Sequence, residues 1–148
     1  MHGVFLKAFP KLSFFEGKKV LLLCHAGADI DSIASAGAFY FSLKKKSGVV
    51  IVVPDHLSLL AKSFAKKTGI PFVLNPGNLD GFDAVLLFDL SSFEMLGGYA
   101  QKIKDYKGLL FVFDHHDKTD FSLLKKSTFL IVEKAVSCTQ VVHSYLEK

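Results

Sequence analysis

Three short stretches of acidic and histidine residues each directly follow an apolar run of strand length. In chain order they comprise His25, Asp29 and Asp31; Asp89; and Asp114, His115 and His116. Carboxylates combined with imidazoles, without clustered cysteines, favour a hard or borderline divalent cation such as Mn²⁺ or Mg²⁺ over structural zinc. Several carboxylates gathered at one place would repel one another without such a cation, so the pattern indicates metal binding.

Asp89 stands alone after its strand, which makes it the natural candidate for a carboxylate shared between two ions. Two ions about 3.5–4 Å apart can hold a phosphate group between them and convert a bound water into hydroxide. The chemistry that these residue types predict is therefore metal-assisted hydrolysis.

The elements that must position these residues alternate along the chain. Apolar runs predict strands over 20–24, 49–53, 71–74, 84–88, 109–113 and 129–132. Amphipathic stretches between and after them predict helices over 32–46, 56–67, 94–106 and 137–147. Strands separated by helices predict an α/β fold, a three-layer Rossmann-like domain with a mostly parallel sheet of five or six strands. In such a sheet the carboxyl ends of the strands share one edge, where ligands bind, so we expect the three stretches to meet there.

The chain of 148 residues predicts one domain over 1–148, whose first 17 residues form an amphipathic helix packed on the sheet or an arm toward a protein partner. No apolar run approaches the roughly 20 residues needed to span a bilayer, and no signal peptide begins the chain, so we expect no membrane association and a cytoplasmic location. Cys24 and Cys138 are too few for a disulfide framework, and we expect both to be small buried residues.

The net charge of +4 comes from lysine alone, because the sequence contains no arginine. Planar recognition of phosphate usually employs the arginine guanidinium. If the protein binds phosphates, a metal, backbone amides or a further segment must supply much of the phosphate binding. The run 44–46 of three lysines is most simply a solvated helix end that complements the helix dipole, rather than a nucleic-acid patch.

Order and spacing of these stretches resemble the motifs of the DHH family of phosphoesterases from about residue 18 to the end of the chain. The family's first motif is matched here by His25-Ala-Gly-Ala-Asp29-Ile-Asp31-Ser32, and its second by Val85-Leu-Leu-Phe-Asp89. Asp114-His115-His116 resembles the triplet that gives the family its name. The stretch 135–141, rich in small and hydroxyl residues, resembles the helix start that follows the triplet. Known members are RecJ-type exonucleases, nano-RNases, cyclic dinucleotide phosphodiesterases and family II inorganic pyrophosphatases.

The resemblance implies a role for each residue. His25 and Asp29 would bind one Mn²⁺ or Mg²⁺ ion, Asp31 and His115 the other, and Asp89 would bridge the two. His116 would face the substrate phosphate. Asp114 would orient a histidine without itself binding a metal ion. The implied function is hydrolysis of phosphodiester or phosphomonoester bonds in nucleotides, short oligonucleotides or other phosphorylated small molecules by metal-activated water.

The family supplies a further metal-binding Asp in a fourth motif and a C-terminal substrate-binding domain, and neither is recognisable after His116. We therefore expect catalysis to be incomplete without a downstream segment. The alternative hypothesis is a catalytically inactive DHH-like binding module for a protein or nucleic-acid partner.

Two of these residues have simpler interpretations. Asp31 could cap a helix that begins near Ser32, and Asp89 could be a turn residue. Asp55 also follows a predicted strand, and contact with substrate is a weaker prediction for it, since it matches no family ligand.

Overall fold

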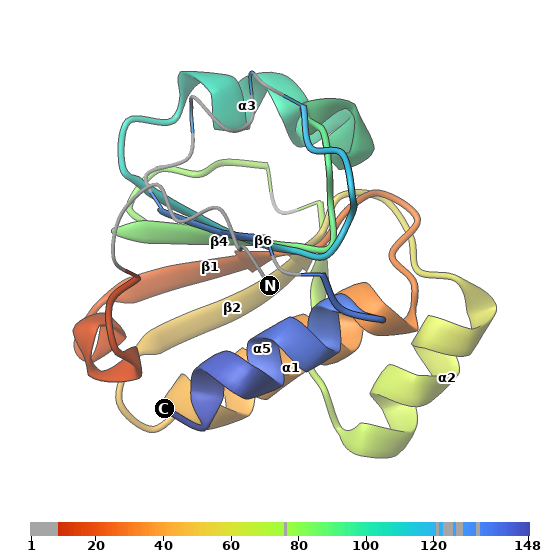
Figure 1. The fold of residues 1–148 in the computed structure, drawn as a ribbon, viewed down its shortest axis with the longest axis horizontal. Helices are drawn as coiled ribbons and strands as arrows, with labels where there is room; N and C mark the ends of the chain where they lie inside the picture. The colour runs from red at the N-terminus through yellow and green to blue at the C-terminus, as the bar shows by residue number, and fades with distance from the viewer. Residues whose placement is uncertain (1–8, 76, 121, 123–125, 127–128, 133) are drawn as a thin grey trace.

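The computed structural model describes residues 9–75, 77–120, 122, 126, 129–132 and 134–148. In these residues one sheet of six parallel strands has the order β3-β2-β1-β4-β5-β6, with helices on both faces (Figure 1). The strands are β1 (Lys19–Leu23), β2 (Gly48–Val53), β3 (Val73–Leu74), β4 (Ala84–Phe88), β5 (Leu109–Asp114) and β6 (Phe129–Val132). The helices are η1 (Leu12–Phe15), α1 (Ile30–Leu43), α2 (Leu59–Thr68), η2 (Phe93–Tyr99), α3 (Ala100–Asp105) and α5 (Cys138–Leu146). The three-layer α/β prediction is confirmed.

The strand order reverses beside β1, which pairs with β2 on one side and with β4 on the other. From β1 the chain runs outward to β2 and β3, then returns to β4 and continues to β5 and β6. Open parallel sheets bind their ligands at such a reversal, outside the carboxyl ends of the strands. The residues after β1 and β4 therefore occupy the position of greatest interest.

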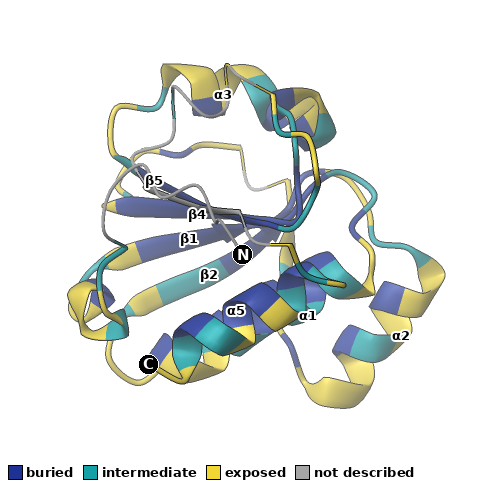
Figure 2. Cartoon of the chain, viewed as in Figure 1, coloured by how far each residue is buried: buried dark blue, intermediate teal, exposed yellow. Residues whose placement is uncertain are grey.

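Each face of the sheet has its own apolar core. Leu22 and Phe88 point to the face covered by α1 and α5, whereas Leu21 and Leu87 point to the face covered by η2 and α3. This alternation follows from the period of two along a strand. Residues of β4 are buried throughout, as expected for a strand covered on both faces (Figure 2).

Aromatic side chains fill the core between α1, α5 and the sheet. The Phe39 ring lies 5.0 Å from that of Phe113 and stacks on Tyr145 at 5.5 Å. Phe9 packs against Phe113 at 4.8 Å, and Phe15 is fully buried. In its described part, residues 9–17, the N-terminal segment packs against this core and contains one 3₁₀ turn, Leu12–Phe15. Residues 1–8 lie outside the described residues, so the choice between a helix and an arm over 1–17 stays a prediction.

Three predicted helix boundaries are wrong, each for a local reason. The first helix begins at Ile30 because Asp29 caps it, so Asp31 is not its N-cap. The second begins at Leu59 rather than at residue 56, since Ser58 caps it by accepting a hydrogen bond from the Ala61 N–H. The region predicted as one helix over 94–106 is divided, because Gly97 has φ 54° and ψ −128°, a conformation incompatible with a helix.

Cys24 and Cys138 are both fully buried and unpaired, as predicted. Among the described residues, no helix is both long and apolar enough to cross a membrane.

Candidate metal centre

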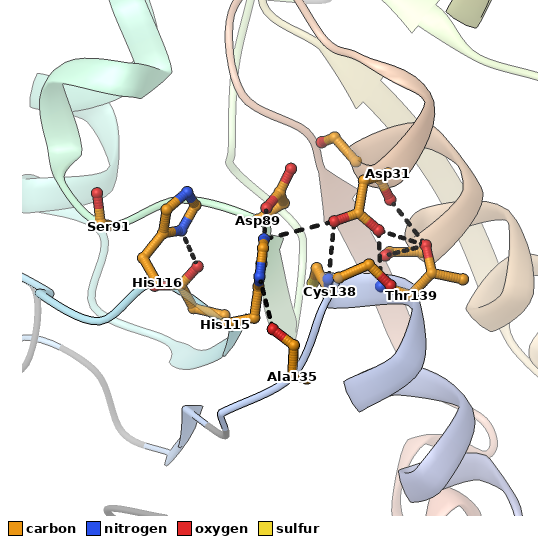
Figure 3. A network of polar contacts seen from close by, with 12 residues as sticks. Asp31, Asp89, Ser91, His115, His116, Ala135, Cys138 and Thr139 are labelled. Atoms are coloured by element: carbon orange, nitrogen blue, oxygen red, sulfur yellow. Dashed lines mark hydrogen bonds and ion pairs between the residues drawn. The ribbon is translucent and has the colours of Figure 1, made fainter.

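Asp89 lies at the centre of a group of acidic and histidine side chains at the carboxyl edge of the sheet. Its Oδ2 is 3.6 Å from His25 Nε2, and its Oδ1 is 3.1 Å from His115 Nε2. His25 Nε2 is in turn 3.8 Å from Asp29 Oδ1, and His115 Nε2 is 3.6 Å from Asp31 Oδ2. The structure thus brings side chains from three strand ends around a single carboxylate (Figure 3).

Two groups of possible metal ligands share Asp89. One comprises His25, Asp29 and Asp89, and the other Asp89, His115 and His116; within each group one ligand atom per residue lies within 4.8 Å of the others. Distances of this size leave room for a cation that draws the ligand atoms inward. A carboxylate that belongs to both groups is placed as a bridging ligand would be.

The histidines are oriented by acceptors at Nδ1. His25 Nδ1 lies 2.8 Å from the Ala26 carbonyl oxygen and His115 Nδ1 lies 3.3 Å from that of Ala135. A carbonyl can only accept, so in each hydrogen bond Nδ1–H is the donor. In the neutral imidazole, Nε2 then carries the lone pair and points toward Asp89. Metal-binding histidines are held in this way, with the second nitrogen bonded to a carbonyl or carboxylate.

The surroundings of Asp89 fit a cation. Its side chain is only 7% exposed. Although His115 Nε2 lies close, Asp89 Oδ1 accepts no hydrogen bond from the described residues. A buried carboxylate oxygen facing an imidazole lone pair is costly unless a positive ion lies between them. Asp89 also has φ 60°, a conformation that non-glycine residues seldom adopt and that is concentrated at functional sites.

Asp29 and Asp31 lie in the first turn of α1 but have different partners. Asp29 is the N-cap, and its Oδ1 accepts a hydrogen bond from the Ser32 N–H at 2.9 Å. Asp31 instead accepts hydrogen bonds from α5, namely from the N–H groups of Cys138 and Thr139 at 2.7 and 2.8 Å. The capping interpretation of Asp31 is therefore wrong: Asp29 caps α1, and Asp31 accepts from the first two N–H groups of α5, whose N-cap is Ser137.

Asp114 is fully buried and holds His116. Its Oδ1 is 2.5 Å from His116 Nδ1, and its Oδ2 accepts a hydrogen bond from the Thr119 hydroxyl at 3.2 Å. Burial raises the pKa of Asp114, and the bond from His116 opposes that shift. The contact engages Nδ1, and one ring nitrogen of His116 lies within 4.8 Å of ligand atoms of Asp89 and His115.

Burial lowers the pKa of His25, but Asp89, the Ala26 carbonyl and Asp29 outweigh it, and the net pKa is raised. Negative charge therefore dominates the electrostatics of this edge, which again favours a cation.

Asp55 contacts the protein's own backbone. Its Oδ1 accepts hydrogen bonds from the N–H groups of Gly27 and His56 at 2.9 and 2.6 Å. Its slight burial favours the neutral acid, but these N–H groups and the His56 imidazole lower the pKa of Asp55. Asp55 thus ties down the loop that carries His25, and the substrate contact suggested for it stays a prediction.

Sequence reasoning missed Thr119, the Ala135 carbonyl and Thr139 as neighbours of the site. A small-and-hydroxyl stretch was noticed over 135–141, but nothing local indicates that Thr139 meets Asp31, which is 108 residues away along the chain. That pairing arises only because α1 and α5 pack side by side on the same face of the sheet (Figure 1).

Comparisons with known proteins give a structural neighbour and a family. The crystal structure of an exopolyphosphatase-related protein from Bacteroides fragilis superposes with a TM-score of 0.73 at 16% sequence identity, over 87% of this chain and 39% of that one. This likeness establishes a common fold, and the chain spans less than half the length of that protein. No curated protein sequence matches the chain. The family model described as the DHH family, N-terminal domain, matches residues 19–148, and the chain therefore belongs to the DHH family.

Proposed function

We propose that this domain binds two divalent cations, Mn²⁺ or Mg²⁺, and that, completed by a downstream segment, it hydrolyses phosphodiester or phosphomonoester bonds of nucleotides or short oligonucleotides. The observation that carries the proposal is the shared position of Asp89, whose two carboxylate oxygens each face an imidazole Nε2. His25, Asp29 and Asp89 would hold one ion, and Asp31, Asp89 and His115 the other. When bound, such ions lower the pKa of water and neutralise charge on a phosphoryl group.

The chain's own residues would then act on the substrate. His116, held through Nδ1 by Asp114, would present Nε2 to a phosphate oxygen as a hydrogen-bond donor. In this arrangement both ring nitrogens of His116 would act as donors, Nδ1 to Asp114 and Nε2 to the phosphate. The ester class of the substrate is supported by membership of the DHH family. A neighbour described as exopolyphosphatase-related adds short polyphosphate as a substrate to compare.

Manganese titration by calorimetry tests the metal site. Wild type should bind two ions, whereas Asp89→Asn, whose side chain also tolerates positive φ, should lose most of the affinity for both. Asp105→Asn is the matched control, because Asp105 is an exposed carboxylate at the end of α3 that bonds only to Gln101 among the described contacts. Equal titrations for wild type and Asp89→Asn would overturn the proposal.

Thermal unfolding gives a second measurement. A ligand at a hundredfold excess over its Kd stabilises a protein by about 2.7 kcal/mol per site. For a domain of this size that corresponds to a rise of roughly 5–11 °C in Tm. With both sites filled, wild type should gain about twice this increase with Mn²⁺ relative to EDTA, and Asp89→Asn should not.

Hydrolysis of bis-p-nitrophenyl phosphate, p-nitrophenyl phosphate, a dinucleotide and tripolyphosphate with excess Mn²⁺ separates the substrate classes. Turnover of a nucleotide ester but not of polyphosphate supports the proposed substrate. Metal binding without turnover of any of these compounds, both by this chain and by a longer form that includes the downstream segment, favours a binding module instead.

A further inference from the structure

The segment 135–139, which includes the start of α5, contacts two of the three side chains proposed for the second ion, His115 and Asp31. The Ala135 carbonyl accepts a hydrogen bond from His115 Nδ1, and the amino end of α5 donates to the Asp31 carboxylate (Figure 3). The same short segment therefore holds Asp31 and His115, two proposed ligands that are far apart along the chain.

The hydrogen bonds of Asp31 determine which of its oxygens is available. A carboxylate has about four lone-pair positions. Three are used by α5: Oδ1 accepts from the Thr139 N–H and hydroxyl at 2.8 and 2.5 Å, and Oδ2 accepts from the Cys138 N–H at 2.7 Å. The remaining position is on Oδ2, the oxygen that lies 3.6 Å from His115 Nε2. Asp31 is thus prepared to bind an ion through Oδ2 alone.

Thr139 contributes the one side chain among these donors. Its hydroxyl has a single proton, and the shortest of its contacts is the one to Asp31 Oδ1. Ser35 Oγ lies 3.3 Å away and can donate to Thr139 Oγ1 in return. Ser35 is fully buried, so this contact fixes the rotamer of the threonine.

We infer that Thr139 is a positioning residue for the second metal ion. Its hydroxyl holds the Asp31 carboxylate so that only Oδ2, on the side of His115, is available to the ion. This inference rests on the proposed function. It assigns the α5 hydroxyl a part in metal affinity, in addition to any part in packing α5 against α1.

Calorimetric Mn²⁺ titration of Thr139→Val, Thr139→Ser and wild type tests the inference. Valine keeps the shape and loses the hydroxyl, whereas serine keeps the hydroxyl. Loss of a group that orients a ligand costs about 10–100-fold in metal affinity. We expect Thr139→Val to weaken one of the two sites by this factor, with the other within about twofold, and Thr139→Ser to restore most of the affinity.

The matched control is Thr68→Val. Thr68 is also a helical threonine whose hydroxyl donates a hydrogen bond, to the Phe64 carbonyl at 2.8 Å, but it lies on α2, away from the metal residues. This control should titrate as wild type. If Thr139→Val does not fold, Thr139→Ala and Thr139→Ser provide the same comparison, and the folding of each is checked by thermal unfolding in EDTA.

Each outcome has a distinct meaning. Equal titrations for Thr139→Val and wild type, or equal weakening of both sites without rescue by serine, overturn the inference and leave the two-ion proposal standing. Absence of Mn²⁺ binding by wild type overturns both.

Discussion

Asp114 Oδ1 and His116 Nδ1 lie 2.5 Å apart, and the Asp114 carboxylate that makes this bond is fully buried at the end of β5. A buried carboxylate needs partners, and Asp114 has two: His116 on one oxygen and Thr119 on the other. The pair therefore fixes the imidazole of an otherwise partly exposed histidine, and it does so from inside the sheet.

Asp114→Asn keeps the shape of the side chain and removes its charge. If His116 contacts the substrate phosphate, hydrolysis should fall about 10–100-fold, the usual effect of losing an orienting carboxylate. The fall is measured as the steady-state rate of hydrolysis of whichever of the four phosphate compounds named above wild type hydrolyses fastest. In a His116→Ala background, Asp114→Asn should have little further effect, because the two residues would act as one unit. Full additivity of the two substitutions would contradict this pairing.

Asp29 caps α1, and substitution can separate this role from the metal binding proposed for it. Asparagine is as good an N-cap as aspartate, so Asp29→Asn should leave the free energy of unfolding in EDTA nearly unchanged. Asp29→Ala loses the bond to the Ser32 N–H and should cost about 1 kcal/mol. Both should weaken Mn²⁺ binding, since neither supplies a carboxylate. Urea unfolding in EDTA together with calorimetry measures the two effects, and normal Mn²⁺ binding by Asp29→Asn would count against Asp29 as a ligand.

Substitutions of Phe39 and Phe41, which both lie on α1, compare a buried with a partly exposed phenylalanine on one helix. Phe39 is fully buried among aromatic rings, and truncation of a buried Phe to Ala costs about 3–5 kcal/mol. Phe41 is 44% exposed and has a Lys44 ammonium 4.8 Å from its ring centroid. We expect Phe41→Ala to cost less than about 1 kcal/mol. Chemical denaturation of the two variants should give this contrast, and similar losses would contradict the packing described for α1.

Cys24 should be inert in the folded protein. Burial raises its pKa to about 12, with the Ser32 contact opposing the shift and the charges of Asp29 and Asp89 adding to it. Because the thiolate is the reactive form, only about one molecule in ten thousand would carry it at pH 8. Iodoacetamide should label the native protein very slowly and both cysteines rapidly in denaturant, with labelling followed by mass spectrometry. Rapid native labelling at Cys24 would show that β1 is not buried as described.

Most of the fold could be predicted from the sequence because its signals are local. Strand-length apolar runs located β4 and β6 at their observed bounds, and the alternation of strands with helices predicted a parallel sheet. Helix starts were less predictable. Several residues near residue 58 could serve as caps, and the effect of Gly97 depends on a backbone conformation that its neighbours impose.

The sequence by itself determined the residues of the candidate site, since acidic and histidine residues after successive parallel strands must share one edge of the sheet. Only the tertiary structure decided how they are held. Asp31 was a candidate cap for the helix near Ser32, but its carboxylate accepts hydrogen bonds from the first N–H groups of α5, because α1 and α5 pack together. Thr139 and the Ala135 carbonyl are close to the site for the same reason. Contacts between residues so far apart along the chain depend on how the elements pack, and no local pattern of residues encodes them.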